Sequence, residues 1–104
     1  MNVINKYIVL VLVSAIKEKR LVTFLYHGLN RTVQCATLGY TPSGNAAIRA
    51  YQIKGSTNSG NIPCWRLFLI GDIHQLVLTE DKFCGVPPSY KKSDPAFSRI
   101  DAEL

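Results

Sequence analysis

The chain has 104 residues, of which 47% are hydrophobic and 18% charged, and its formal net charge at pH 7 is +5. This length suits one domain with a single core, and the composition excludes a globally disordered chain. The positive charge is concentrated in residues 1–78, where the acidic residues are Glu18 and Asp72. A basic body of this kind favours polyanionic partners such as nucleic acid.

The three cysteines, Cys35, Cys64 and Cys84, are an odd number without metal-ligand spacing. We therefore expect neither a disulfide framework nor a zinc site, and we predict no metal and no cofactor. Cys35 is interpreted as a small buried residue within a strand. Cysteine usage of this kind favours a reducing compartment, so the predicted location is cytoplasmic.

Residues 3–19 contain the apolar run from Tyr7 to Val13. This stretch continues without a break into the charged residues 17–20. The run is too short to span a bilayer, and its continuation into a basic end argues against a signal peptide, so no membrane association is expected. Apolar residues at helical spacing predict an amphipathic helix that covers a sheet. Further apolar residues widen this face and predict a homo-oligomer or a protein partner: Val9, Leu10 and Val13.

From Leu21 onward the apolar pattern has a period of two, which is typical of strands. The expected strands are residues 21–26, 31–40, 46–54, 65–70 and 74–79, separated by turns at 27–30 and 41–45, a loop at 55–64 and a bend at 71–72. No connection is long enough for parallel pairing. The sequence therefore predicts a mainly β, α+β fold: a small five-stranded antiparallel barrel of SH3-like or Sm-like type over residues 21–79, preceded by the helix.

The tail, residues 80–104, is rich in turn-forming residues. Asp94 followed by Pro95 matches the start of a helix, with Asp as the N-cap and Pro at the first position. We expect a short final helix after this pair. The tail is expected to lie across the barrel surface within the same single domain.

No arrangement of residues indicates catalysis. His27 and His74 fall in a turn and at a strand start, and neither lies in a nucleophile motif. The loop 55–64 has glycines and hydroxyls suited to a phosphate, but it lacks the lysine and the strand-to-helix context of a phosphate-binding loop. A plain connection is therefore the simpler interpretation of this loop. For the protein as a whole, we predict a binding function without catalytic residues.

Taken in order, several segments resemble the WYL domain family in its short, stand-alone form. They are AIKEKRLVTFLYHG, RTVQCATLG, GNAAIRAYQ, WRLFLIGDI and DKFCGVPPSYKKSDPAF, which together span nearly the whole chain. The resemblance implies an Sm-like or SH3-like ligand-sensing module of bacterial transcription regulation or phage defence. It also implies single-stranded nucleic acid or a nucleotide as the ligand.

The resemblance places the first-strand tyrosine of the family at Tyr26, the following basic residue at Arg31 and the third-strand tyrosine at Tyr51. In the fourth strand, Arg66 and Phe68 match the family pattern. Two positions depart from it: residues 46–48 stand in place of the tripeptide that names the family, and Asp72 stands in place of a second arginine. No helix-turn-helix segment accompanies the domain.

Alternation puts Arg49 and Tyr51 on one face of their strand, and Arg66 and Phe68 on one face of theirs. If these strands pair in register, guanidinium groups and rings converge, which suits phosphate and base. The predicted binding residues are Arg49, Tyr51, Arg66, Phe68, Arg31, His27 and Tyr26.

Two alternatives remain open at this stage. In the first, Tyr51 and Phe68 belong to the core, the arginines form solvated salt bridges at the barrel rim, and Trp65 lies on the opposite face. In the second, the protein has no nucleic-acid ligand and works as a protein interaction or oligomerisation subunit.

Overall fold

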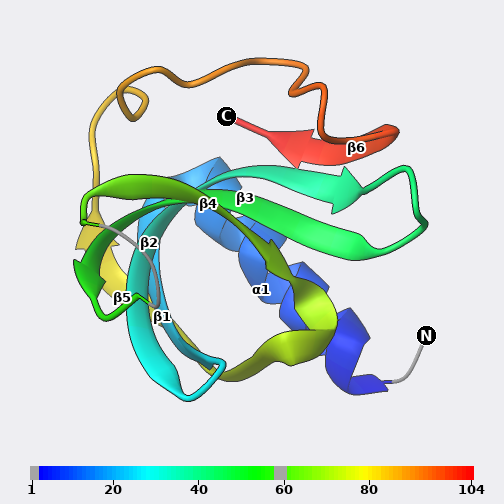
Figure 1. Ribbon diagram of the computed structural model, residues 1–104. Coiled ribbons are helices and arrows are strands. Elements are labelled where there is room, and N and C mark those ends of the chain that lie inside the picture. Colours follow the sequence, from blue (N-terminus) through cyan, green and yellow to red (C-terminus); the bar gives the residue numbers. More distant parts are fainter. Residues whose placement is uncertain (1–2, 58–60) are drawn as a thin grey trace.

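The computed structural model describes residues 3–57 and 61–104, which form one helix, six strands and a short 3-10 helix (Figure 1). The elements in chain order are α1 (Val3–Glu18), β1 (Arg20–Tyr26), β2 (Leu29–Tyr40), β3 (Ala46–Gly55), β4 (Cys64–Leu69), η1 (Ile70–Asp72), β5 (Ile73–Lys82) and β6 (Arg99–Glu103). The predicted helix and the five predicted strands are present.

The strands form one antiparallel sheet in the order β4-β3-β2-β1-β5, and β6 pairs with β2. The long strand β2 shares one edge between two partners: its first residues pair with β1, and Thr37 to Tyr40 pair with β6. Strands β4 and β5 end the main path and are not paired with each other, so the described strands do not close the sheet. The mainly β fold is confirmed, whereas closure into a barrel is not.

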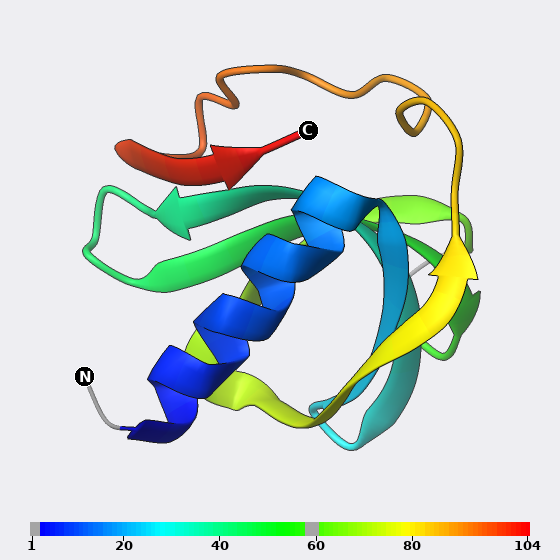
Figure 2. The same cartoon turned by 180° about the vertical axis from the view of Figure 1, so that it is seen from behind.

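Helix α1 crosses one face of the curved sheet (Figure 2). Leu12 and Ala15 are fully buried, and they pack into a core that includes Val22 and Phe24 of β1. The helix therefore provides one wall of the core, as its apolar spacing predicts. Among the described helices, none has both the length and the apolar character needed to cross a membrane.

The second apolar side of α1 is narrower than the sequence predicts. Val9 and Val13 are partly buried and pack against the core, because the curved sheet reaches around the helix. Tyr7 and Leu10 remain, each 59% exposed and three residues apart on the helix surface. Among the side chains of α1 that the structure describes, the extra apolar face thus consists of these two.

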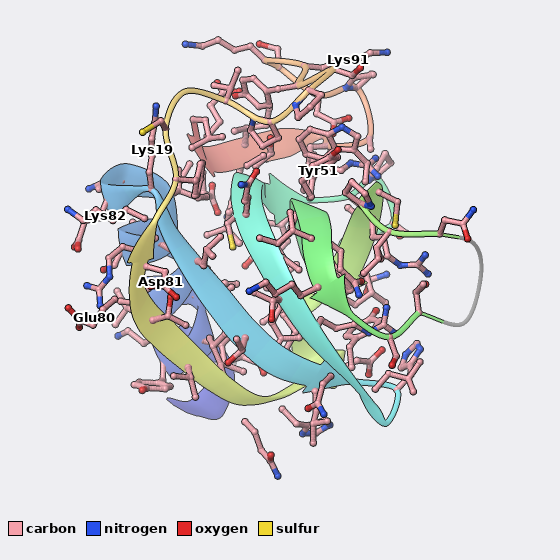
Figure 3. All side chains as sticks on the ribbon, turned by 90° about the vertical axis from the view of Figure 1, so that its left-hand side faces the viewer. Lys19, Tyr51, Glu80, Asp81, Lys82 and Lys91 are labelled. Carbon is pink, nitrogen blue, oxygen red and sulfur yellow. The ribbon has the colours of Figure 1, made fainter. Side chains whose placement is uncertain are left out.

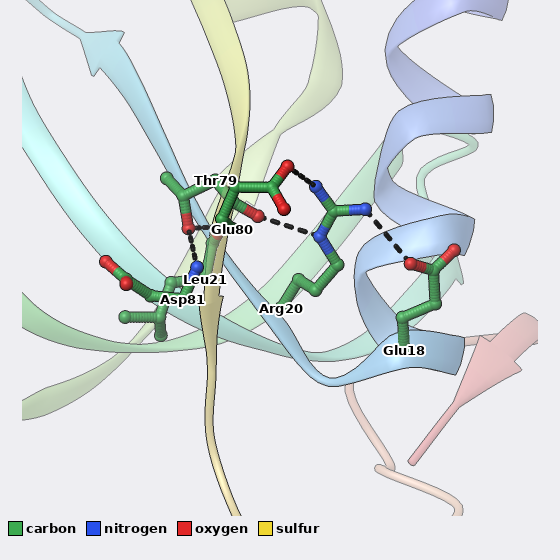
Figure 4. A network of polar contacts seen from close by, with 6 residues as sticks. All are labelled: Glu18, Arg20, Leu21, Thr79, Glu80 and Asp81. Atoms are coloured by element: carbon green, nitrogen blue, oxygen red, sulfur yellow. Dashed lines mark hydrogen bonds and ion pairs between the residues drawn. The ribbon is translucent and has the colours of Figure 1, made fainter.

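Arg20 joins the end of α1 to strand β5 (Figure 4). Its Nε donates to the Thr79 carbonyl at 2.7 Å, and its two Nη groups form ion pairs with Glu18 at 3.0 Å and Glu80 at 3.2 Å. Exposed ion pairs add little stability singly, but three contacts from one planar group fix an orientation. This contact sets the direction in which the chain leaves the helix.

The expected final helix is absent from the described tail, and the prediction of it is wrong. Asp94 does act as a cap: its Oδ1 accepts from the Ala96 backbone N–H at 2.9 Å, and Phe97 N–H donates to its carbonyl. The chain then extends into β6, because β1 has left the edge of β2 and exposes backbone groups that a strand can satisfy. The tail does lie across the sheet within the same unit (Figure 1).

Candidate ligand-binding site

The pairing of β3 with β4 divides the predicted binding residues between two faces of the sheet. Tyr51 lies opposite Trp65, and Ala50 lies opposite Arg66. Directly opposed residues in an antiparallel pair point to the same face, and neighbours along a strand point to opposite faces. Arg49 and Tyr51 therefore share a face with Trp65, while Arg66 shares the other with Phe68. The predicted convergence of Arg49 with Arg66 is wrong.

On the inner face, Arg31 lies between two aromatic rings. Its guanidinium carbon is 5.6 Å from the centre of the Tyr26 ring and 5.7 Å from that of Phe68. Its Nη groups donate to the Gln52 Oε1 at 3.3 Å and to the Tyr26 carbonyl at 3.2 Å. The residue is only 2% exposed, although arginine is seldom buried without an acidic partner.

The charge of Arg31 is incompletely compensated. Its Nε has no hydrogen-bond partner, and the described ion pairs include none between Arg31 and a carboxylate. Burial lowers the pKa of Arg31, and the nearby positive charge of Arg66 lowers it further, while Tyr26 and Cys64 oppose the shift. Arginine nevertheless stays protonated, so a cation remains in this apolar setting.

His27 and Tyr26 complete this group. The exposed His27 ring stacks on Tyr26 with centroids 4.2 Å apart, and its Nε2 is 3.4 Å from a carboxylate oxygen of Asp72. The Tyr26 hydroxyl accepts from the Leu69 backbone N–H at 3.0 Å, which holds the ring in place. We call these residues the Arg31 cluster: Tyr26, His27, Arg31 and Arg66.

Phe68 shares a face with Arg66 as predicted, but its role differs from the one predicted. It is fully buried and makes edge-to-face contacts with Phe24 and Tyr26, at centroid distances of 5.0 and 4.9 Å. A ring in this position belongs to the core and has no free face for a ligand base. Its predicted stacking role is therefore wrong, and the alternative of a core residue is correct for Phe68.

The outer face holds the other predicted residues beneath the tail. Arg49 Nε donates to the Asp94 Oδ2 at 2.9 Å, so this arginine anchors the tail to β3. The Tyr51 ring lies 5.2 Å from that of Trp65, whose Nε1 donates to the Pro88 carbonyl at 2.8 Å. Figure 3 shows Tyr51 on the side of the sheet that the tail crosses.

Tyr90 brings a third ring to this outer face. Its ring is tilted by 30° from that of Trp65 with the centroids 6.5 Å apart, and its hydroxyl donates to the Leu104 carbonyl at 3.0 Å. Burial raises the pKa of Tyr90, as does the negative charge of Glu103, so the hydroxyl stays neutral at physiological pH. A pocket of about 410 Å³ lies between these sheet residues and the tail segments 89–91 and 94–96. We call it the tail pocket.

Reasoning from sequence missed the contributions of Thr37, Tyr90 and Asp94 to this face, whereas Trp65 lies on the face opposite to Phe68, as the first alternative has it. The positions of Trp65 and Arg49 follow from the β3–β4 register, which the eight residues between these strands leave undetermined at the level of sequence. Asp94 has a sequence signal, its cap motif, but the motif does not reveal its partner on β3. Among the described residues, no group of three or more His, Cys, Asp or Glu side chains is arranged to hold a metal ion.

Comparison with known proteins finds no matching family model, no matching curated protein and no matching solved structure. The resemblance to the WYL family therefore stays a prediction.

Proposed function

We propose that the protein is a non-enzymatic regulatory module that binds single-stranded nucleic acid or a nucleotide through the Arg31 cluster. The observation that carries this proposal is the Arg31 guanidinium, buried between two rings with neutral oxygens as its hydrogen-bond partners. The net charge of +5 favours the same class of ligand.

A phosphate would supply the compensation that Arg31 lacks. Burying a cation without a counter-charge costs free energy, and a bound anion reduces this cost for Arg31, whose pKa the nearby positive charge of Arg66 already lowers. Arg31 itself is buried, so the direct N–H donors to a phosphate would come from the partly exposed guanidinium of Arg66, and Arg31 would contribute through its charge. The exposed His27 ring, stacked on Tyr26, offers an outer surface for a base.

The expected affinity is low. Few cations belong to the Arg31 cluster, and the carboxylate of Asp72 next to His27 opposes an approaching phosphate. We expect binding of single strands at about micromolar level or weaker, with a shallow dependence on salt, because few counterions are released.

The test is fluorescence anisotropy with a labelled single-stranded oligonucleotide at low salt. Arg66→Ala is expected to weaken binding about tenfold, since one charge-assisted contact is lost. Arg99→Ala is the matched control, because Arg99 is exposed and lies at the other end of β2, paired with Asp101. Asp72→Arg is expected to strengthen binding. No binding of an oligonucleotide or nucleotide by any of these proteins would reject the proposal.

The proposed cellular role follows from the resemblance to WYL domains, which suggests a ligand sensor in bacterial transcription regulation or phage defence. The curved, open antiparallel sheet with its covering helix is compatible with the SH3-like or Sm-like architecture of that family. We include this architecture in the proposal.

A protein interaction module is the second candidate function. The observation that favours it is the exposure of Tyr7 and Leu10, two large apolar side chains that are neighbours on α1. Association through this pair would give a homo-oligomer or a complex with another protein.

A further inference from the structure

Cys64 begins strand β4 on the face of the sheet that carries the Arg31 cluster. It lies opposite Gln52 in the β3–β4 pairing and two residues before Arg66. Residues two apart on a strand point to the same face, so the Cys64 thiol and the Arg66 guanidinium share this side. Cys64 is half-buried, and β4 is an end strand of the main path, so its sulfur is partly open to solvent at this edge.

Gln52 connects this thiol to Arg31. The Gln52 Oε1 accepts from Arg31 Nη1 at 3.3 Å. Its Nε2 donates to the carbonyls of Lys54 and Ser56 at 3.1 and 3.0 Å, and the residue is fully buried, so its amide has a fixed position. Directly opposed residues have Cβ atoms about 4.5–5.5 Å apart, which places the Cys64 sulfur next to the amide that holds the guanidinium.

The electrostatics agree with this geometry. Burial and the positive charge of Arg66 lower the pKa of Arg31, whereas Cys64 opposes the shift, as a nearby negative charge does. The Arg31 Nε has no hydrogen-bond partner, although the residue is only 2% exposed. Two cations and an unsatisfied N–H therefore lie beside a thiol, and such surroundings attract anions.

We infer that Cys64 is a site of reversible thiolation by small disulfides that carry negative charge. The Cys64 thiolate attacks one sulfur of the disulfide, a bond forms between these two sulfur atoms, and the original sulfur–sulfur bond breaks. The Cys64 proton passes to solvent and the departing thiolate takes up a proton, so Cys64 is oxidised and the departing half of the disulfide is reduced. The bound half places its negative charge by Arg31 and Arg66, and free thiols release it again.

The adduct at Cys64 has two consequences. It supplies the counter-charge that Arg31 lacks, and it takes the place of a ligand phosphate. The first consequence does not depend on nucleic-acid binding, whereas the second rests on the proposed function of the Arg31 cluster. Thiolation of Cys64 therefore closes the ligand site under oxidising conditions.

The test compares two disulfides of similar size and opposite charge, dithiodipropionate and cystamine. Mass spectrometry of acid-quenched, digested protein follows the reaction at each cysteine at pH 8 and low salt. The exposed Cys84 is the internal control, because two acids and one lysine precede it in residues 80–82.

The ratio of the dithiodipropionate rate to the cystamine rate is expected to be at least about tenfold higher at Cys64 than at Cys84, and added salt should reduce the difference. Arg66→Ala should lower this ratio at Cys64 alone. Equal ratios at the two cysteines, or no reaction of Cys64 with dithiodipropionate, would overturn the inference.

A Cys84→Ser protein with one adduct at Cys64 separates the two consequences. The dithiodipropionate adduct is expected to have a higher thermal midpoint than the cystamine adduct, because the first compensates the charge of Arg31 and the second adds to it. Affinity for the labelled oligonucleotide is expected to fall about tenfold with the anionic adduct only.

Equal midpoints for the two adducts would refute the contact with Arg31, and unchanged oligonucleotide affinity would refute the closing of the site. Absence of oligonucleotide binding by the unmodified protein would reject the proposed function and the closing together. In that case the rates and the midpoints still decide whether Cys64 is a thiolation site.

Discussion

Leu12 and Leu10 of helix α1 allow a matched test of whether the helix is part of the core. Leu12 is fully buried against the sheet, whereas Leu10 is 59% exposed two residues earlier. Leu→Ala at a buried site removes transfer free energy and leaves a cavity, which costs about 3 kcal/mol and up to about 5. The same change at an exposed helix position is expected to cost less than about 0.5 kcal/mol.

The cost expected for Leu12→Ala is a large part of the free energy of unfolding of a domain of this size, which is about 5–15 kcal/mol. Leu12→Ala should therefore lower the thermal midpoint by roughly 10–20 °C, with Leu10→Ala close to the unaltered protein. Urea denaturation followed by circular dichroism gives both free energies of unfolding, and equal slopes would show that the unfolded states are comparable. Equal destabilisation by the two variants would mean that α1 does not pack on the sheet as described.

Further predictions concern association, thiol reactivity and close backbone packing. Leu10→Lys should convert the predicted dimer or larger oligomer into a folded monomer, and a monomer mass for the unaltered protein in light scattering at micromolar concentration would contradict this. Burial raises the pKa of the Cys35 thiol to about 12, so at pH 8 a thiol reagent should label the exposed Cys84 and spare Cys35, as mass spectrometry of labelled peptides would report. Gly39→Ala should destabilise the β2–β6 pairing, because an added Cβ would overlap the Arg99 carbonyl oxygen, and faster amide exchange in β6 would reveal the loss.

The sequence predicted secondary structure correctly where that structure depends on the pattern of neighbouring side chains along the chain. The period of two identifies strands in β1 and in the first half of β2, because one face of each is buried there and alternate residues are therefore apolar. A similar alternation is present in the tail, where Ile100 and Ala102 are half-buried and Arg99 and Asp101 are exposed, but the cap motif at Asp94 favoured a helix. The tail forms a strand because it pairs with backbone groups that β1 leaves free on β2. A local motif carries no information about such a distant partner.

In the candidate site, too, the local features were predicted correctly and the long-range ones were not. Residue types and alternation correctly placed Arg49 with Tyr51, and Arg66 with Phe68, on common faces of their strands. Which face of β3 coincides with which face of β4 depends on the register across the eight residues that join them, and a shift of one residue exchanges the two faces.

By itself, therefore, the sequence determined the helix, the five main strands and the excess of positive charge, since each depends on neighbours along the chain. Only the tertiary structure decided that Arg31 is a buried cation between Tyr26 and Phe68, and that Arg49 fastens the tail through Asp94. These contacts join residues far apart in the chain. Their formation depends on strand register and on the path of the tail, which the burial of the whole core fixes together.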